Sequence, residues 1–127
     1  MRAIRIDRFG PPEVLVPCEV PEPAPGPGEV LVRLHAIGVN FADTERRRGI
    51  YDPPPLPWIP GREGAGVVEA VGSGTDPAWL SARVAFWNPS AATAAAYAEL
   101  AVAPADSLFR LPDDLSFELG AAKQASP

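Results

Sequence analysis

The sequence predicts a mainly β domain, a barrel or sandwich with little helix, and three observations lead to this prediction. Short apolar stretches recur between turn residues at a spacing of roughly 8 to 12 positions, which is typical of barrels and sandwiches. Seventeen prolines among 127 residues break both helix interiors and central strands, so long regular elements are not expected. Apolar residues make up 46% of the chain, which suffices for one domain with a modest core.

The first third of the chain predicts strands and proline-rich loop. Residues 2–6 alternate between charged and apolar side chains, which predicts an opening strand. A short strand is expected within 11–28, where the prolines favour extended backbone at a sheet edge. Residues 29–39 predict the clearest strand, because two sets of side chains alternate along it. One set comprises Val30, Val32, Leu34 and Ala36, and the other comprises Leu31, Arg33, His35 and Ile37.

The later elements are expected to be short as well. A helical turn within 40–51 should end at Gly49, and residues 62–74 predict a strand punctuated by glycines. Ser116 is a candidate N-cap, because it precedes an apolar-rich stretch. Further elements are expected as strands at 83–87, 96–102 and 107–111, and as a helix within 111–122.

Charge and composition exclude several classes of function. The net charge of −5 argues against nucleic-acid affinity, which needs basic surface to neutralise phosphates. Cys18 is the only cysteine and His35 the only histidine, so neither a disulfide nor a metal site is expected. Early charges do not fit a signal peptide, and no apolar run approaches the roughly 18 residues of a membrane span. We therefore expect a cytoplasmic protein that binds neither nucleic acid nor membrane.

The glycines between 64 and 74 do not form a dinucleotide-binding fingerprint. Gly64 and Gly66 have the first spacing of the G-x-G-x-x-G pattern but lack its third glycine, and Gly72 and Gly74 lack it too. The valine-rich sequence between the two pairs is typical of a strand. These glycines are therefore predicted to let a strand bend or another backbone approach closely.

Asn40 and Asp43 allow two interpretations. Asn is a favoured N-cap, and an acidic residue three positions later resembles a capping box, so the pair alone predicts the start of a helix. The alternative is functional, with a polar amide and a carboxylate at the mouth of a cleft. The residue types alone leave both interpretations open.

A second group of candidates lies nearby in the sequence. Arg62 and Glu63 are adjacent, so on a strand they face opposite sides, and one of the two charges can point inward, where it would need a partner. Phe41, Tyr51 and Trp58 are either core residues or the lining of a flat apolar pocket. No serine, histidine and acid arrangement for nucleophilic catalysis can be argued from these residues.

Residues 36–51, "AIGVNFADTERRRGIY", and 56–74, "LPWIPGREGAGVVEAVGSG", carry a family resemblance. They resemble the zinc-free quinone oxidoreductases, the zeta-crystallin-like branch of the medium-chain dehydrogenase/reductase superfamily. The flanking stretches match the same family in order, so the resemblance extends up to Ala122.

The resemblance implies a fold and a cofactor. It implies that residues 1–122 form a GroES-like, partly open β-barrel with short helices, and that 123–127 are a polar tail where a Rossmann domain would begin. That Rossmann domain is absent from the 127 residues. NADPH is the cofactor that the resemblance implies for the full enzyme, and this chain alone is expected to bind it weakly or not at all.

The resemblance also implies a reaction and a set of site residues. In such enzymes a hydride passes from the nicotinamide to a quinone or a conjugated carbonyl, and the acceptor oxygen gains negative charge. Zinc-dependent relatives carry metal ligands at the positions of Asn40 and Arg62, so here hydrogen-bond donors are expected in place of zinc. Asn40, Asp43 and Tyr51 are the expected catalytic residues. The residues expected to line the substrate or cofactor cleft are Phe41, Arg62 and Glu63.

Three departures from the family pattern keep alternatives open. Ser81 and Ala82 stand where the family has a turn glycine and an aspartate, the stretch 87–95 replaces a glycine-containing hairpin, and the family's closing segments are missing. The chain alone is therefore expected to be inactive. One alternative is a stand-alone GroES-like module that binds a partner or self-associates through exposed apolar surface. The other is half of an enzyme that a separate Rossmann chain completes.

Overall fold

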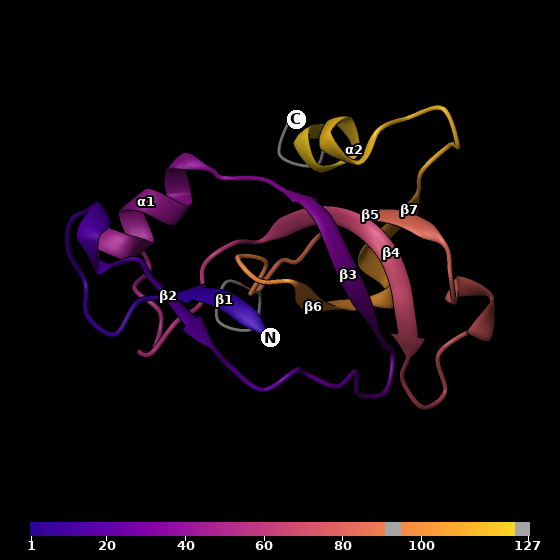
Figure 1. Ribbon diagram of the computed structural model, residues 1–127, viewed down its shortest axis with the longest axis horizontal. Coiled ribbons are helices and arrows are strands. Elements are labelled where there is room, and N and C mark those ends of the chain that lie inside the picture. Colours follow the sequence, from indigo (N-terminus) through magenta and orange to yellow (C-terminus); the bar gives the residue numbers. More distant parts are fainter. Residues whose placement is uncertain (91–94, 124–127) are drawn as a thin grey trace.

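The five-stranded sheet at the centre of the molecule curls toward closure. The computed structural model describes residues 1–90 and 95–123 (Figure 1). The sheet has the strand order β6-β3-β4-β5-β7, and each strand pairs antiparallel with its neighbours. Its strands are β3 (Glu29–Ile37), β4 (Glu63–Val71), β5 (Arg83–Trp87), β6 (Leu100–Pro104) and β7 (Leu108–Arg110).

The two edge strands of this sheet follow one another in the chain, and this fixes its shape. Only the 3-10 turn η3 (Ala105–Ser107) separates β6 from β7. A flat sheet of five strands would put its edges roughly 19 Å apart, whereas three residues span about 10 Å. The sheet must therefore bend until its edges approach, which gives a mainly β, partly open barrel as the sequence predicted.

A smaller two-stranded sheet lies beside the barrel. Its strands are β1 (Arg2–Arg5) and β2 (Val16–Glu19), with η1 (Pro12–Val14) between them. Isolated bridges join Ala3 to Ala98 and Ile6 to Trp58. The opening strand and the short strand in the proline-rich stretch are thus confirmed.

The main core lies inside the curled sheet, against one of the two sets of side chains that alternate along β3. Val30 and Val32 are fully buried, and Leu34 packs against them. A second cluster gathers around Trp58, which is 4% exposed and is therefore a core residue. The buried members of the main cluster are Val30, Val32, Val68, Val84, Phe86, Ala101, Ala103 and Leu108.

Gly66 shows why β4 carries glycines. A Cβ at this position would lie 1.9 Å from the carbonyl oxygen of Arg33 on the neighbouring strand. The β3–β4 ladder also shifts register between Leu34 and Ala36. The close backbone approach and the irregular strand are what the sequence predicted for these glycines.

Capping residues mark the end of the first short helix and the start of the second, as the sequence predicted. Helix α1 (Phe41–Arg48) ends at Gly49, whose φ of 77° suits the left-handed C-terminal position. Helix α2 (Phe117–Lys123) follows Ser116, whose hydroxyl accepts a hydrogen bond from the N–H of Leu119 at 3.2 Å. It lies across β3, β4 and β5, at the upper edge of Figure 1. The 3-10 turn η2 (Pro77–Trp79) connects β4 to β5.

Some expectations fall partly outside the described residues. Residues 91–94 of the altered stretch 87–95, and 124–127 of the expected polar tail, lie outside them. Within 1–90 and 95–123, no helix is both long and apolar enough to cross a membrane. The same residues contain no group of three metal-ligating side chains placed to hold an ion.

Candidate functional site

Asn40 and Glu63 meet where β3 leads into α1 and where β4 begins. Asn40 is the N-cap of α1, and its Nδ2 donates a hydrogen bond to Oε1 of Glu63 at 2.8 Å. The Glu63 side chain is buried, whereas Arg62 is half-buried, so the predicted inward charge is that of Glu63. Burial raises the pKa of Glu63, the hydrogen bond from Asn40 opposes this rise, and the charge of Asp43 adds to it.

Asp43 has the capping role that the sequence suggested. Its Oδ2 accepts a hydrogen bond from the backbone N–H of Asn40 at 3.0 Å, and the residue is 3% exposed. Burial raises the pKa of Asp43, opposed by the N–H of Asn40 and by the positive charge of Arg46. Its Oδ1 has no hydrogen-bond partner in the described part of the chain. A carboxylate thus lies buried directly behind the Asn40 backbone.

Arg46 is a member of this site that the sequence analysis missed. It is 3% exposed, one helical turn after Asp43, and its Nη2 lies 3.6 Å from Oδ2 of Asp52. The guanidinium carbon lies 5.3 Å from the centre of the Tyr51 ring. The three-residue spacing from Asp43 on one helix face was the available signal, but a run of three arginines is typical of a solvated surface.

Arg62 anchors the chain after β5. Its Nε donates to the carbonyl oxygen of Asn88 at 3.0 Å, and its Nη2 contacts the carbonyl oxygen of Pro89. The guanidinium also stacks over Trp87, 4.3 Å from the ring centre. Burial lowers the pKa of Arg62, and the positive charge of Arg46 adds to this effect. These contacts hold the strand end of β5 against the start of β4.

Phe41 and Tyr51 lie at the surface beside the hydrogen-bonded group. Phe41 is 78% exposed and Tyr51 is 56% exposed. Tyr51 joins the group through its ring contact with Arg46. Both residues are therefore placed to meet a ligand or another protein surface, and neither is part of the core.

Tyr97 is a second residue that the sequence analysis missed. It lines a small cavity of about 60 Å³ together with Asp43. Burial raises the pKa of Tyr97 strongly, and the negative charge of Asp43 raises it further. The sequence separation of 54 positions gives no signal for this pairing, because it depends on how the chain brings the segment before β6 beside α1.

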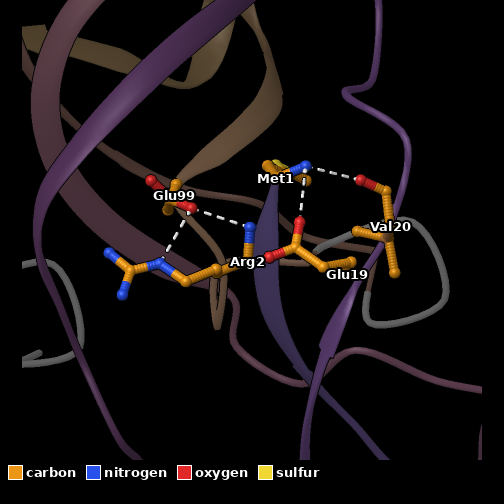
Figure 2. Close-up of polar contacts among 5 residues, drawn as sticks. All are labelled: Met1, Arg2, Glu19, Val20 and Glu99. Carbon is orange, nitrogen blue, oxygen red and sulfur yellow. Dashed lines mark hydrogen bonds and ion pairs between the residues drawn. The ribbon is translucent and has the colours of Figure 1, made fainter.

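A larger groove of about 610 Å³ lies on the other side of Tyr97. Figure 2 shows the charged groups at its edge, which pair with one another. The Met1 ammonium donates to the carbonyl oxygen of Val20 at 2.7 Å and lies 3.6 Å from the Glu19 carboxylate. Arg2 donates to Glu99 twice, through its backbone N–H at 2.7 Å and through its Nε at 3.3 Å. The groove is lined by Arg2, Ala3, Ile4, Pro17, Cys18, Glu19, Ile37, Tyr97, Ala98 and Glu99.

The arrangement supports hydrogen bonding to a polar ligand at Asn40. One N–H of the Asn40 side chain is donated to Glu63, so the amide retains a second N–H and its oxygen. The structure brings Asn40, Asp43 and Glu63 together. Arg62 and Tyr51 lie at the margin of this group, and Phe41 lies outside it.

Comparison with known proteins gives consistent relatives. The chain is 44% identical over 121 residues to a quinone oxidoreductase of Pseudomonas aeruginosa, and 40% identical over 124 residues to the human quinone oxidoreductase. The two matches extend over 95% and 96% of this chain but over only 36% and 37% of the relatives. The chain thus spans about a third of the length of the curated relatives it matches.

Solved structures agree with these matches. The structure of an Escherichia coli quinone oxidoreductase complexed with NADPH superposes with a TM-score of 0.86 at 39% identity, covering 96% of this chain and 36% of that one.

The family described as alcohol dehydrogenase GroES-like domain matches residues 26–113, which is most of the sequence. The curled sheet, the two short helices and these matches together show that the chain belongs to the alcohol dehydrogenase GroES-like domain family.

Proposed function

We propose that this chain is the catalytic-domain portion of an NADPH-dependent quinone oxidoreductase that acts without zinc. The observation that carries the proposal is the Asn40 amide, fixed at the start of α1 by two buried carboxylates, in a domain 40–44% identical to quinone oxidoreductases. Its substrates are then quinones or conjugated carbonyl compounds. We further propose that residues 1–122 form this domain and that 123–127 lead toward a Rossmann domain.

The described residues suit the substrate better than the cofactor's phosphates. Asp43 and Glu63 place two buried carboxyl groups at the site, and Arg62 already donates to backbone carbonyl oxygens. Phosphate groups need free cations or a glycine-rich helix start, so the chain alone should bind NADPH weakly. When bound to the complete enzyme, NADPH supplies the hydride.

The role proposed for Asn40 follows from where charge develops. A quinone or enone oxygen gains negative charge as the molecule is reduced, and a fixed N–H donor stabilises that charge. Asn40 has one such N–H left after its bond to Glu63. Asp43 holds the backbone of Asn40, and Tyr51 is the hydroxyl donor that we assign to the outer side of the site.

A chimera tests this proposal. We expect residues 1–122, fused to the remaining segments of the Pseudomonas aeruginosa quinone oxidoreductase, to oxidise NADPH in the presence of a quinone, while the 127-residue chain alone does not. Asn40→Ala in the chimera should lower kcat by roughly 10²-fold, because one donor to the developing oxyanion is lost. A chimera that binds NADPH but gives no quinone-dependent oxidation contradicts the proposal.

A second candidate function is association without catalysis. Four apolar side chains that are more than half exposed lie at or next to the two ends of α1, and such surface commonly binds another protein. They are Val39, Phe41, Ile50 and Tyr51. As a separate alternative, a Rossmann chain covers them and completes the enzyme. Mixing the two chains would then restore quinone-dependent NADPH oxidation.

A further inference from the structure

The Glu63 carboxylate occupies a position that the backbone leaves open for it. Glu63 is 2% exposed, and the N–H of Gly38 donates to its carbonyl oxygen at 3.2 Å. A Cβ on Gly38 would lie 1.9 Å from Oε1 of Glu63. The missing side chain at Gly38 therefore makes room for the carboxylate directly beneath the segment that leads to Asn40.

The contact with Glu63 determines which way the Asn40 amide faces. Nδ2 of Asn40 donates to Oε1 of Glu63 at 2.8 Å, so the nitrogen of the amide faces the carboxyl group. The amide oxygen takes no part in this contact. The second N–H also points away from Oε1, because the two N–H bonds of an amide diverge.

Asn40 is held from two sides at once. Its backbone N–H donates to Asp43 and its side-chain N–H donates to Glu63, so main chain and side chain are both fixed by carboxylates. Oε2 of Glu63 has no hydrogen-bond partner within the described ranges 1–90 and 95–123. The contact with Asn40 is thus the side-chain hydrogen bond that the structure assigns to this buried carboxylate.

We propose that Glu63 is a positioning residue that fixes the Asn40 carboxamide, so that its second N–H is presented to the substrate oxygen. The inference rests on the proposed function of Asn40 as the donor to that oxygen. It assigns Glu63 a role through Asn40 and without contact to the substrate. A residue that only filled the space beside Gly38 could be replaced by an apolar side chain of similar size.

Two substitutions separate positioning from space filling. Glu63→Leu fills similar volume but cannot accept a hydrogen bond, whereas Glu63→Gln keeps an acceptor oxygen. Glu69→Gln is the matched control, because Glu69 is an exposed residue of the same strand. Gly38→Ala is an independent variant, since its added Cβ displaces the carboxylate while leaving Glu63 in the sequence.

The orientation of Asn40 can be read by NMR in the 127-residue chain itself. The sequence has two asparagines and one glutamine, so few side-chain amides contribute to the spectrum. We expect the hydrogen-bonded proton of Asn40 to resonate downfield, to lose that shift in Glu63→Leu and Gly38→Ala, and to keep most of it in Glu63→Gln. The Asn88 amide, whose oxygen accepts from Ser90 N–H at 2.9 Å, is the internal reference.

Kinetics of the chimera give the second readout. Glu63→Leu should lower kcat by about tenfold to a hundredfold with little change in KM for the quinone, because a misplaced donor loses transition-state stabilisation. Glu63→Gln should restore most of kcat. Full kcat in Glu63→Leu, or an unchanged Asn40 amide in Glu63→Leu or Gly38→Ala, overturns the positioning role. An inactive parent chimera instead counts against the proposed function and leaves the NMR result to decide the positioning of Asn40.

Discussion

At the scale of single residues, the site is built from buried charges whose partners lie far away in the sequence. Asn40 and Glu63 are 23 positions apart, and Asp43 and Tyr97 are 54 apart. The sequence shows that either Arg62 or Glu63 can face inward, because neighbours on a strand alternate. Only the packing of β4 against the segment around Gly38 decides that it is Glu63.

The burial of Glu63 predicts a pH dependence of stability. Its pKa is raised in the folded state, so the folded protein holds the proton more tightly than the unfolded chain. The contribution of Glu63 to the free energy of unfolding should therefore be largest below pH 4.5, the ordinary value of the group, and be lost as pH rises through the folded pKa. Glu63→Gln should remove this part of the decrease.

Denaturant unfolding at a series of pH values between about 4 and 8 measures the effect. Asp43→Asn should also reduce the decrease in the free energy of unfolding as pH rises, because burial raises the pKa of Asp43 as well. Glu69→Gln, which changes an exposed residue on the same strand, controls for the loss of one negative charge. Parallel curves for the parent chain and Glu63→Gln would contradict the prediction.

At the scale of elements, patterns within one segment predicted the structure well. The alternation along 29–39 identified β3, and Gly49 and Ser116 marked the end of α1 and the start of α2. These signals depend only on neighbouring residues, so they can be recognised in the sequence. The burial of Arg46 was not predicted, because a run of arginines is typical of a solvated face and its partner Asp52 lies beyond the helix.

The β3–β4 pair predicts a strong effect of a single methyl group. Gly66→Ala should lower the free energy of unfolding by about 3 kcal/mol, because its Cβ meets the backbone of Arg33, which cannot move aside like a side chain. Gly74→Ala is the control, since its Cβ meets nothing within 4 Å. Its φ of 71° limits the cost there to about 1 kcal/mol.

Chemical denaturation of the two variants separates the steric effect of the added Cβ from the effect of backbone conformation. Equal losses for Gly66→Ala and Gly74→Ala would show that backbone conformation, and not the approach of β3 to β4, accounts for the glycines. A larger loss for Gly66→Ala supports the close approach of the two strands as the reason for a glycine in this sheet.

At the scale of the whole molecule, apolar surface is concentrated beside the candidate site. Phe41 is 78% exposed and Val39 is 68% exposed, although the sequence left open whether Phe41 belongs to the core. Sequence could not decide this, because a phenylalanine at the first position of a helix suits either a core or a contact surface.

This surface predicts concentration-dependent self-association of the isolated chain. Light scattering should report a mass above 13.4 kDa that increases with protein concentration. The double variant Val39→Ser and Phe41→Ser should shift the distribution toward monomer, because it removes the most exposed apolar side chains of the patch. Phe109→Ser, at an exposed position on β7, should change it less. A single 13.4 kDa species at millimolar concentration would exclude this behaviour.

The groove next to Tyr97 contains a side chain that can be labelled selectively. Cys18 lines it and is the only thiol of the chain, so a maleimide dye attaches at one known place. The rate of labelling then reports how accessible the groove is to solvent. In a longer form of the protein, slow labelling would mean that later residues cover the groove, and fast labelling would mean that it stays open for a ligand.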